Sequence, residues 1–183
     1  MILRKGFEIL DEEVINKVGL PCFIKPNAGG SSFGVTKVKT KEQIQPAIEK
    51  AFGESDEVMI EAFMQGTETT CGCYKTKDKE VVFPSTEVVT SNEFFDYDAK
   101  YNGQVDEITP ARIPEETAER VRLLTSAIYD ILGCEGIIRI DYIITEGEKV
   151  NLLEINTTPG MTATSFIPQQ VRAAGLDIKD VMT

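Results

Sequence analysis

The side chains with the clearest chemical use lie on two predicted neighbouring strands near the C-terminal end. Because side chains alternate along a strand, Arg139 and Asp141 share one face of the first strand. Glu154 and Asn156 share one face of the second strand for the same reason. Two acids, an amide and a guanidinium on one β-ribbon make a candidate site for a metal ion or a phosphate.

The turn between these strands decides whether the four side chains meet. A two-residue turn at residues 147–148 is favoured by the glycine at its first position. This turn places Asp141 directly opposite Glu154. It also places Arg139 opposite Asn156. A three-residue turn would break this register.

An opposed pair of carboxylates needs a neutralising partner. Cross-strand neighbours have Cβ atoms roughly 4.5–5.5 Å apart, so the two acids repel unless a proton or a divalent cation lies between them. Two carboxylates and an amide oxygen, in a chain without histidine, suit Mg²⁺. The alternative is a solvated face with ordinary surface charges. Leu152 and Ile143, which this register puts on the same face, indicate partial cover and favour the metal.

A glycine-rich loop, residues 29–34, is a candidate phosphate loop between two predicted strands. Glycines let the backbone approach an anion, and exposed N–H groups supply donors. The loop is not a Walker A motif, because Val35 stands where that motif needs lysine. We interpret it as the tip of a hairpin flap, with Lys25 able to reach a phosphate. A flexible Gly/Ser turn without function is the equal alternative.

Two further features point in the same direction. Glu61 and Glu68 flank a seam where a ligand between two domains could meet them. Lys100 and Tyr101 close an aromatic stretch, residues 94–97, that suits packing on a planar base. Each feature alone has an ordinary interpretation as solvated surface.

The elements that position these residues follow from periodicity, caps and turn residues. A capping box at Thr40 and Gln43 opens a helix with Pro46 near its start. A second helix begins at Pro114 and ends at Gly133. Its predicted buried stripe is Val121, Leu124, Ile128 and Ile131. The predicted strands are residues 20–25, 35–38, 57–63, 69–75, 81–88, 136–145 and 150–156, and residues 91–110 form a long loop with a function.

This order of elements predicts an α+β fold, because strands and helices do not alternate as βαβ units. A seam near Gly66 divides a domain of residues 1–66 from a domain of residues 67–183. The chain is 42% hydrophobic, which is enough to bury one or two small cores.

Composition excludes several classes of function. The net charge of −11 repels phosphate backbones and anionic lipid, so we expect no nucleic-acid or membrane partner. The absence of histidine excludes Ser-His-Asp triads and histidine-bound zinc. Four scattered cysteines, with no signal peptide and no apolar span, predict a reduced, cytoplasmic protein.

Taken together, the motifs resemble the ATP-grasp superfamily and, within it, the D-alanine–D-alanine ligase family. The resemblance covers nearly the whole chain in the family's order, and it implies an ATP-grasp fold in which two α+β subdomains sandwich the nucleotide. It rests on FIKPNAGGSSFGVTKV (23–38), MIEAFMQGTE (59–68), FFDYDAKY (94–101), IRIDYI (138–143) and LLEINTTPGMTATS (152–165).

The resemblance implies a role for each candidate residue. The implied ATP-binding residues are Lys25, Gly30, Ser31, Glu61, Ala62, Phe63, Met64, Glu68, Phe94, Lys100 and Leu153. Two Mg²⁺ ions, or Mn²⁺, are held by Asp141, Glu154 and Asn156. The implied catalytic residues are Arg139 and Gly160 at the oxyanion, with Ser31 and Tyr101 as a loop-closing pair. Gly160, Ser165 and Phe166 bind the second substrate.

The implied activity is ATP-dependent formation of a carbon–nitrogen bond between two D-alanines, for peptidoglycan precursors and hence for the cell wall and cell shape. An acylphosphate of the first D-alanine is attacked by the amine of the second through a tetrahedral intermediate. Tyr101 favours an amine over lactate as the nucleophile. The resemblance also implies a homodimer for the full-length enzyme.

Members of that family are longer at the N-terminus, so we expect these 183 residues to lack ligase activity alone. One alternative is a D-alanine–D-lactate ligase or another ATP-grasp ligase. A second alternative is a non-catalytic ATP-binding module. Retention of Arg139, Asp141, Glu154 and Asn156 together argues against that module.

Overall fold

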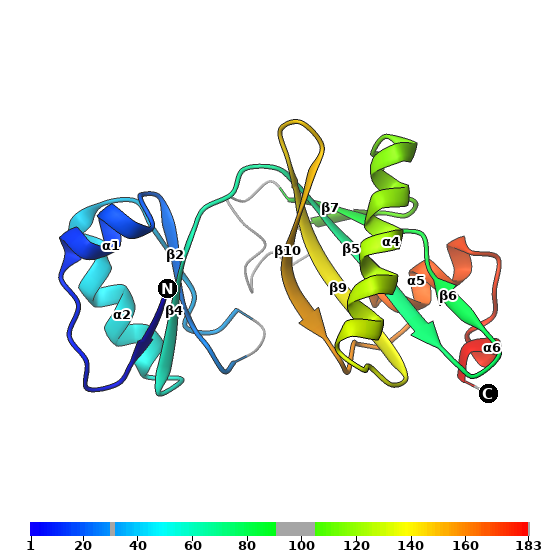
Figure 1. Cartoon of the computed structure of the whole chain (residues 1–183), viewed down its shortest axis with the longest axis horizontal. Helices are drawn as coiled ribbons and strands as arrows, with labels where there is room; N and C mark the ends of the chain where they lie inside the picture. The colour runs from blue at the N-terminus through cyan, green and yellow to red at the C-terminus, as the bar shows by residue number, and fades with distance from the viewer. Residues whose placement is uncertain (30–31, 91–104, 183) are drawn as a thin grey trace. The chain divides into compact units, whose positions relative to one another are not determined.

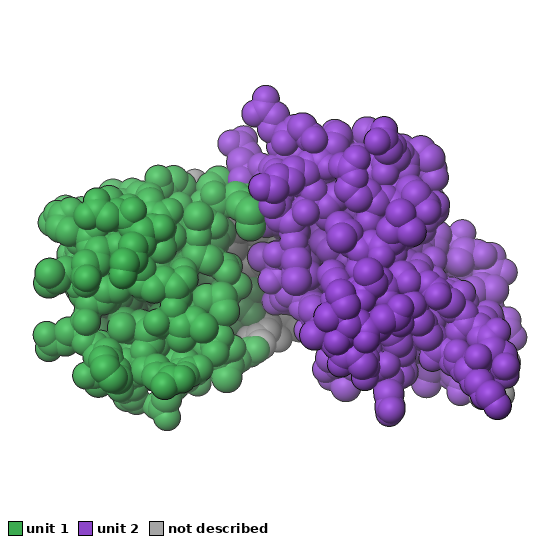
Figure 2. Space-filling model, viewed as in Figure 1, with its two compact units in different colours: residues 1–64, 92–104 green, residues 65–91, 105–183 purple. Residues whose placement is uncertain are grey.

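The computed structural model describes residues 1–29, 32–90 and 105–182. They fall into two compact units, coloured separately in Figure 2: of the described residues, unit 1 holds 1–29 and 32–64, and unit 2 holds 65–90 and 105–182. Each unit packs helices on an antiparallel sheet, so the fold is α+β, as predicted. Within the described ranges, no helix is long and apolar enough to cross a membrane.

Unit 1 is a four-stranded sheet in the order β1-β4-β2-β3, with its helices against one face (Figure 1). Alternate residues of the strands, such as Ile24 and Ile60, are fully buried against helix residues such as Ile48. The sequence pattern had predicted neither the first strand nor the first helix. The elements are β1 (Ile2–Arg4), α1 (Asp11–Lys17), β2 (Cys22–Pro26), β3 (Thr36–Val38), η1 (Lys41–Gln43), α2 (Ile44–Phe52) and β4 (Glu57–Ala62).

The predicted capping box at the start of the second helix is present. Gln43 Oε1 accepts hydrogen bonds from the backbone N–H groups of Thr40 and Lys39, at 3.2 and 2.7 Å. Residues 41–43 form a short 3₁₀ turn before α2. Pro46 is the third residue of α2, where a missing N–H breaks no intrahelical bond.

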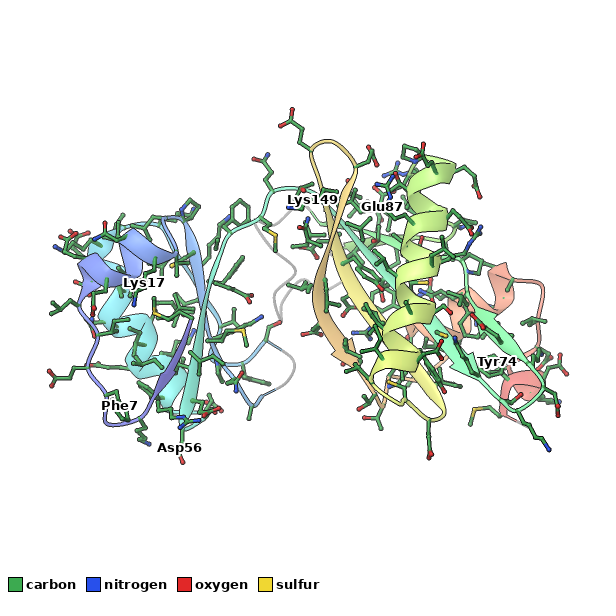
Figure 3. The ribbon with its side chains drawn as sticks, in the orientation of Figure 1. Phe7, Lys17, Asp56, Tyr74, Glu87 and Lys149 are labelled. Atoms are coloured by element: carbon green, nitrogen blue, oxygen red, sulfur yellow. The ribbon has the colours of Figure 1, made fainter. Side chains whose placement is uncertain are left out.

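Unit 2 is a sheet in the order β10-β9-β5-β7-β8, with β6 also paired to β5. Cys71 and Cys73 face helix α4. Tyr74, labelled in Figure 3, packs on Phe83 on the α5 side, with 5.8 Å between ring centroids. The elements are β5 (Thr67–Lys75), β6 (Glu80–Val82), β7 (Thr86–Thr90), β8 (Val105–Ile108), α4 (Glu115–Ile131), β9 (Ile137–Thr145), β10 (Lys149–Asn156), α5 (Phe166–Ala173) and α6 (Ile178–Met182).

Two predictions about the strands of unit 2 were wrong. The predicted strand at residues 81–88 is two strands, β6 and β7, with a break that contains Pro84. Proline has no N–H to donate, so it favours a break in a ladder. The predicted loop at residues 91–110 contains β8, which pairs with β7. Residues 91–104 lie outside the described ranges.

The buried stripe of α4 also differs from the prediction. Val121 is buried as expected, but Leu124 is 37% and Ile131 is 79% exposed. Thr125 and Tyr129 are buried instead, because each has a hydrogen-bond partner below the helix. The Thr125 hydroxyl lies 2.8 Å from the Tyr142 hydroxyl, and the Tyr129 hydroxyl donates to the Gly136 carbonyl at 2.9 Å.

The four free cysteines should differ sharply in reactivity. Burial raises the pKa of Cys71 and Cys73 to about 12 and also raises the pKa of Cys22, so these thiols stay protonated near neutral pH. Cys134 is half-buried, and we expect it alone to react quickly with iodoacetamide. Mass spectrometry of the alkylated native chain checks this. Rapid modification of a buried cysteine, or a fast phase that survives Cys134→Ser, would contradict it.

Candidate active site

The acidic pair, Asp141 and Glu154, is opposed across β9 and β10, as predicted. The route to this register is different. Thr145 pairs with Lys149, so the turn has three residues and alone would shift the pairing by one. A β-bulge at Leu153 adds one residue to β10 and restores the predicted register beyond it.

The same turn changes which side chains cover the acidic pair. Leu152 lies opposite Tyr142, on the other face of the ribbon, and is 49% exposed. Asn151 takes the place opposite Ile143. The prediction that Leu152 shares the face of the acidic pair was therefore wrong. Ile143, two residues after Asp141 on β9, does share that face and is 8% exposed.

Arg139 supplies the charge that the acidic pair needs. It lies opposite Asn156, as predicted. Its Nε and Nη2 donate to the two carboxylate oxygens of Asp141, each at 2.8 Å, and Nη2 lies 3.9 Å from Glu154 Oε1. The partners that the sequence predicts for the acids are a proton or a cation. The structure adds a third partner, a guanidinium from the same strand.

The surroundings of Arg139 keep it charged. Its side chain is 17% exposed and that of Asp141 is 19% exposed. Burial works to lower the pKa of Arg139, but the hydrogen bond and charge of Asp141, with the charge of Glu154, hold that pKa above its ordinary value. The strand therefore presents a permanent cation beside two acids.

The residues of the acidic pair, with Asn156, fit a divalent cation. Asn156 Nδ2 lies 3.1 Å from Glu154 Oε1 and 3.4 Å from Asp141 Oδ2, so both carboxylates converge on one point. A turned amide would present its oxygen to an ion there. In the described ranges no group of three or more acidic or thiol side chains gathers as a metal site. Two carboxylates, an amide oxygen and water suit Mg²⁺.

The N-terminal end of α5 lies beside this cluster. The Arg139 guanidinium carbon is 5.3 Å from the centroid of the Phe166 ring. Ser165 precedes the helix, and its Oγ accepts from the Thr162 N–H at 3.1 Å. A Cβ on Gly160 would lie 2.9 Å from that Oγ, so Gly160 packs directly on Ser165. Unit 2 thus brings together the residues assigned to the oxyanion and the second substrate.

Unit 1 presents a separate group on the face of its sheet away from the helices. Lys25 Nζ lies 2.6 Å from Glu61 Oε1, and both side chains are mostly buried. Phe63 packs on Phe23 with 6.0 Å between ring centroids, and Lys37 Nζ lies 3.7 Å above the Phe63 ring. Three of the residues predicted to bind ATP are therefore neighbours on one surface.

The remaining predicted residues are less informative. Ala62 and Met64 adjoin this group in the chain. Glu68, on β5, lies opposite Ile143 of β9, and Leu153 is the bulge residue of β10. Five predicted residues lie outside the described ranges: Gly30, Ser31, Phe94, Lys100 and Tyr101.

Two residues that the structure places beside these groups were not predicted from the sequence. Lys37 alternates with the buried Val38 on β3, and this pattern could have assigned it to the face of Lys25. Gln170 is a fully buried glutamine on α5. No local pattern identifies it, because its hydrogen-bond partners lie about a hundred positions earlier in the chain.

The fold of this chain is an ATP-grasp fold, with a lysine–glutamate face in one unit and an acid–amide cluster in the other. A family model described as D-ala D-ala ligase C-terminus matches residues 2–183, and the chain belongs to this family. It is 90% identical over its whole length to the D-alanine–D-alanine ligase of Phocaeicola vulgatus and 82% identical to that of Bacteroides fragilis. It covers 56% of each, so the chain spans about half the length of these relatives.

Solved structures agree. The VanG D-Ala:D-Ser ligase of Enterococcus faecalis matches with a TM-score of 0.85 and 33% identity, over 99% of this chain and 53% of that one. The D-alanine–D-alanine ligase of Bacillus anthracis, in complex with ATP, matches with a TM-score of 0.81 and 30% identity, over 100% of this chain and 56% of that one.

Proposed function

We propose that this chain carries the ATP, magnesium and acceptor residues of a ligase that joins two D-alanines into D-alanyl-D-alanine for peptidoglycan precursors. The observation that carries the proposal is the convergence of the acidic pair and Asn156 beside Arg139. The 90% identity to a D-alanine–D-alanine ligase supports the substrate, and the ATP complex of a structural relative supports the nucleotide.

In the proposed reaction, a carboxylate oxygen of the first D-alanine attacks the γ-phosphorus of ATP and ADP leaves. The amine of the second D-alanine then attacks the acyl carbon, and the tetrahedral intermediate collapses with loss of a proton and of phosphate. Positioning and charge stabilisation supply most of the rate in phosphoryl transfer.

The chain's own residues divide these tasks. Lys25 places a positive charge for the phosphates, with Glu61 holding it in position. Asp141, Glu154 and Asn156 would hold two Mg²⁺ ions, and ions bound there would supply positive charge for the transferring group. Lys100, with Gly30, Ser31 and Phe94, keeps its proposed role in ATP binding, although these residues lie outside the described ranges.

Arg139 and the Gly160 N–H are proposed to stabilise the oxyanion of the intermediate. Two of the three guanidinium nitrogens of Arg139 bond to Asp141, which fixes the plane of the group before substrate binds. Ser165 and the Phe166 backbone bind the acceptor carboxylate. Tyr101 favours an amine acceptor. We further propose that the whole enzyme is a cytoplasmic homodimer.

The acceptor is the open part of the substrate assignment, because a structural relative is named as a D-Ala:D-Ser ligase. A chimeric ligase tests it: the 183 residues replace the matching stretch of the Phocaeicola vulgatus enzyme. We expect ADP release that depends on D-alanine, and D-alanyl-D-alanine as the main product against D-serine and D-lactate as competing acceptors. The unaltered Phocaeicola enzyme is the control.

An inactive chimera beside an active control would reject the proposed function, and a depsipeptide or a D-serine product would change the acceptor. The 183 residues alone are expected to form no dipeptide. Their weak binding of Mg·ATP, measured by calorimetry, should fall in Lys25→Ala and in Glu154→Ala.

A further inference from the structure

The central strand of unit 2 has a gap on one edge. β5 pairs with β7 up to Thr70 and with β6 from Cys73, and the chain crosses between the two strands at residues 83–85. Phe83 N–H donates to the Gly72 carbonyl at 2.9 Å. The Gly72 N–H and the Thr70 carbonyl face the same gap, and a buried backbone group needs a partner.

The side chain of Gln170, on α5, fills this gap. Its Oε1 accepts from the Gly72 N–H at 2.8 Å, and its Nε2 donates to the Thr70 carbonyl at 3.0 Å. Nε2 also donates to the Thr86 hydroxyl at 3.1 Å, on the far side of the gap. Gln170 is fully buried, so one side chain ties α5 to two strands with three bonds shielded from water.

Helix α5, which Gln170 anchors, begins beside the acidic pair. Gly72 pairs with Arg139 across β5 and β9, and Thr70 pairs with Asp141. Phe166 lies four residues before Gln170, one helical turn along the same side of α5, and its ring packs on Arg139. Figure 1 shows α4 in front of this sheet and α5 behind it.

We propose that Gln170 is a positioning residue for the acceptor D-alanine. It fixes the start of α5, and with it Ser165, Phe166 and the guanidinium of Arg139, relative to the acidic pair. This inference rests on the proposed function. The competing account is that Gln170 only satisfies buried backbone groups and contributes to stability alone.

Variants of the chimeric ligase distinguish the positioning role of Gln170 from a role in stability alone. Gln170→Met keeps the volume of the side chain and removes all three hydrogen bonds. We expect it to raise the KM for the acceptor D-alanine about 10-fold and to leave the KM for ATP within about 2-fold. Thr86→Val removes the bond from Gln170 Nε2 together with the 2.6 Å hydrogen bond between the hydroxyls of Thr86 and Thr109, and we expect a change of about 3-fold in the same direction. Thr125→Val is the matched control, because it removes a buried hydrogen bond on the opposite face of the sheet.

A control that raises the KM for D-alanine as much as Gln170→Met does would overturn positioning, as would equal changes in both KM values. If Gln170→Met does not fold, the KM values of Thr86→Val decide between positioning and stability alone. Hydrogen exchange of the 183-residue chain separates this inference from the function: amides of Phe166–Ala173 and Gly72 should exchange at least 10-fold faster in Gln170→Met. If the unsubstituted chimera is inactive, unchanged protection there still overturns the anchoring.

Discussion

Glu154→Gln is expected to lower dipeptide synthesis by the chimeric ligase about 1,000-fold without lowering its thermal stability. The carboxylate is a proposed metal ligand, and loss of about 4 kcal/mol of charge stabilisation corresponds to that factor. Its side chain is 53% exposed and lies 3.9 Å from Arg139, so its loss removes little from the folded state.

Asp141→Asn should lower both the rate of dipeptide synthesis and the thermal stability. This carboxylate has the same proposed metal role, but it also accepts both short hydrogen bonds of Arg139, and both side chains are mostly buried. The variant leaves a buried guanidinium without its charged partner, which costs roughly 2–3 kcal/mol. Two acids assigned one chemical task therefore differ in their structural task.

Initial rates of ADP and dipeptide formation at saturating Mg²⁺, beside a thermal melt of each variant, check this pair of predictions. Glu146→Gln, in the turn of the same hairpin, is the control and should retain the rate. The metal assignment would be rejected by near-normal rates in both variants. An equal loss of stability in both would reject the separate structural role of Asp141.

The position of the acidic pair was predictable because alternation along β9 and β10 fixes which side chains share a face. The turn was not predictable to the residue. A three-residue turn and the bulge at Leu153 cancel, so the predicted pairing of Asp141 with Glu154 was right although its stated cause was wrong. A bulge leaves no signature in hydrophobic pattern, since Leu153 would suit either face.

Polar residues explain the errors in the core. Hydrophobic periodicity assigned Leu124 and Ile131 to the buried side of α4, yet Thr125 and Tyr129 hold that side. Their burial depends on hydroxyl and carbonyl partners in β9 and before it, which a local pattern does not contain. Gln170 was missed for the same reason, and it is the clearest case of a polar side chain whose role depends wholly on tertiary contacts.

Gly72→Ala is expected to destabilise the chain by roughly 3 kcal/mol and to lower its melting temperature by about 8 °C. A Cβ at this position would lie 2.4 Å from Ile167 Cδ1, 2.8 Å from Gln170 Oε1 and 2.9 Å from Phe83 Cδ2. These atoms belong to α5 and to the break between β6 and β7, so no single rotation relieves all three contacts. β5 is the central strand of its sheet and is paired on both edges, with β9 and with β7, which resists a shift.

Thermal and urea melts of Gly72→Ala beside Gly29→Ala check this expectation. A Cβ on Gly29 meets its nearest neighbour at 3.5 Å, an ordinary contact, so that variant should stay within about 0.5 kcal/mol of the original chain. Because the methyl group of Gly72→Ala pushes on Ile167 and Gln170, faster hydrogen exchange should appear along α5. A stability loss below about 1 kcal/mol would mean that α5 can move away from β5 at little cost, and the anchoring by Gln170 would then have to be far weaker than its three bonds indicate.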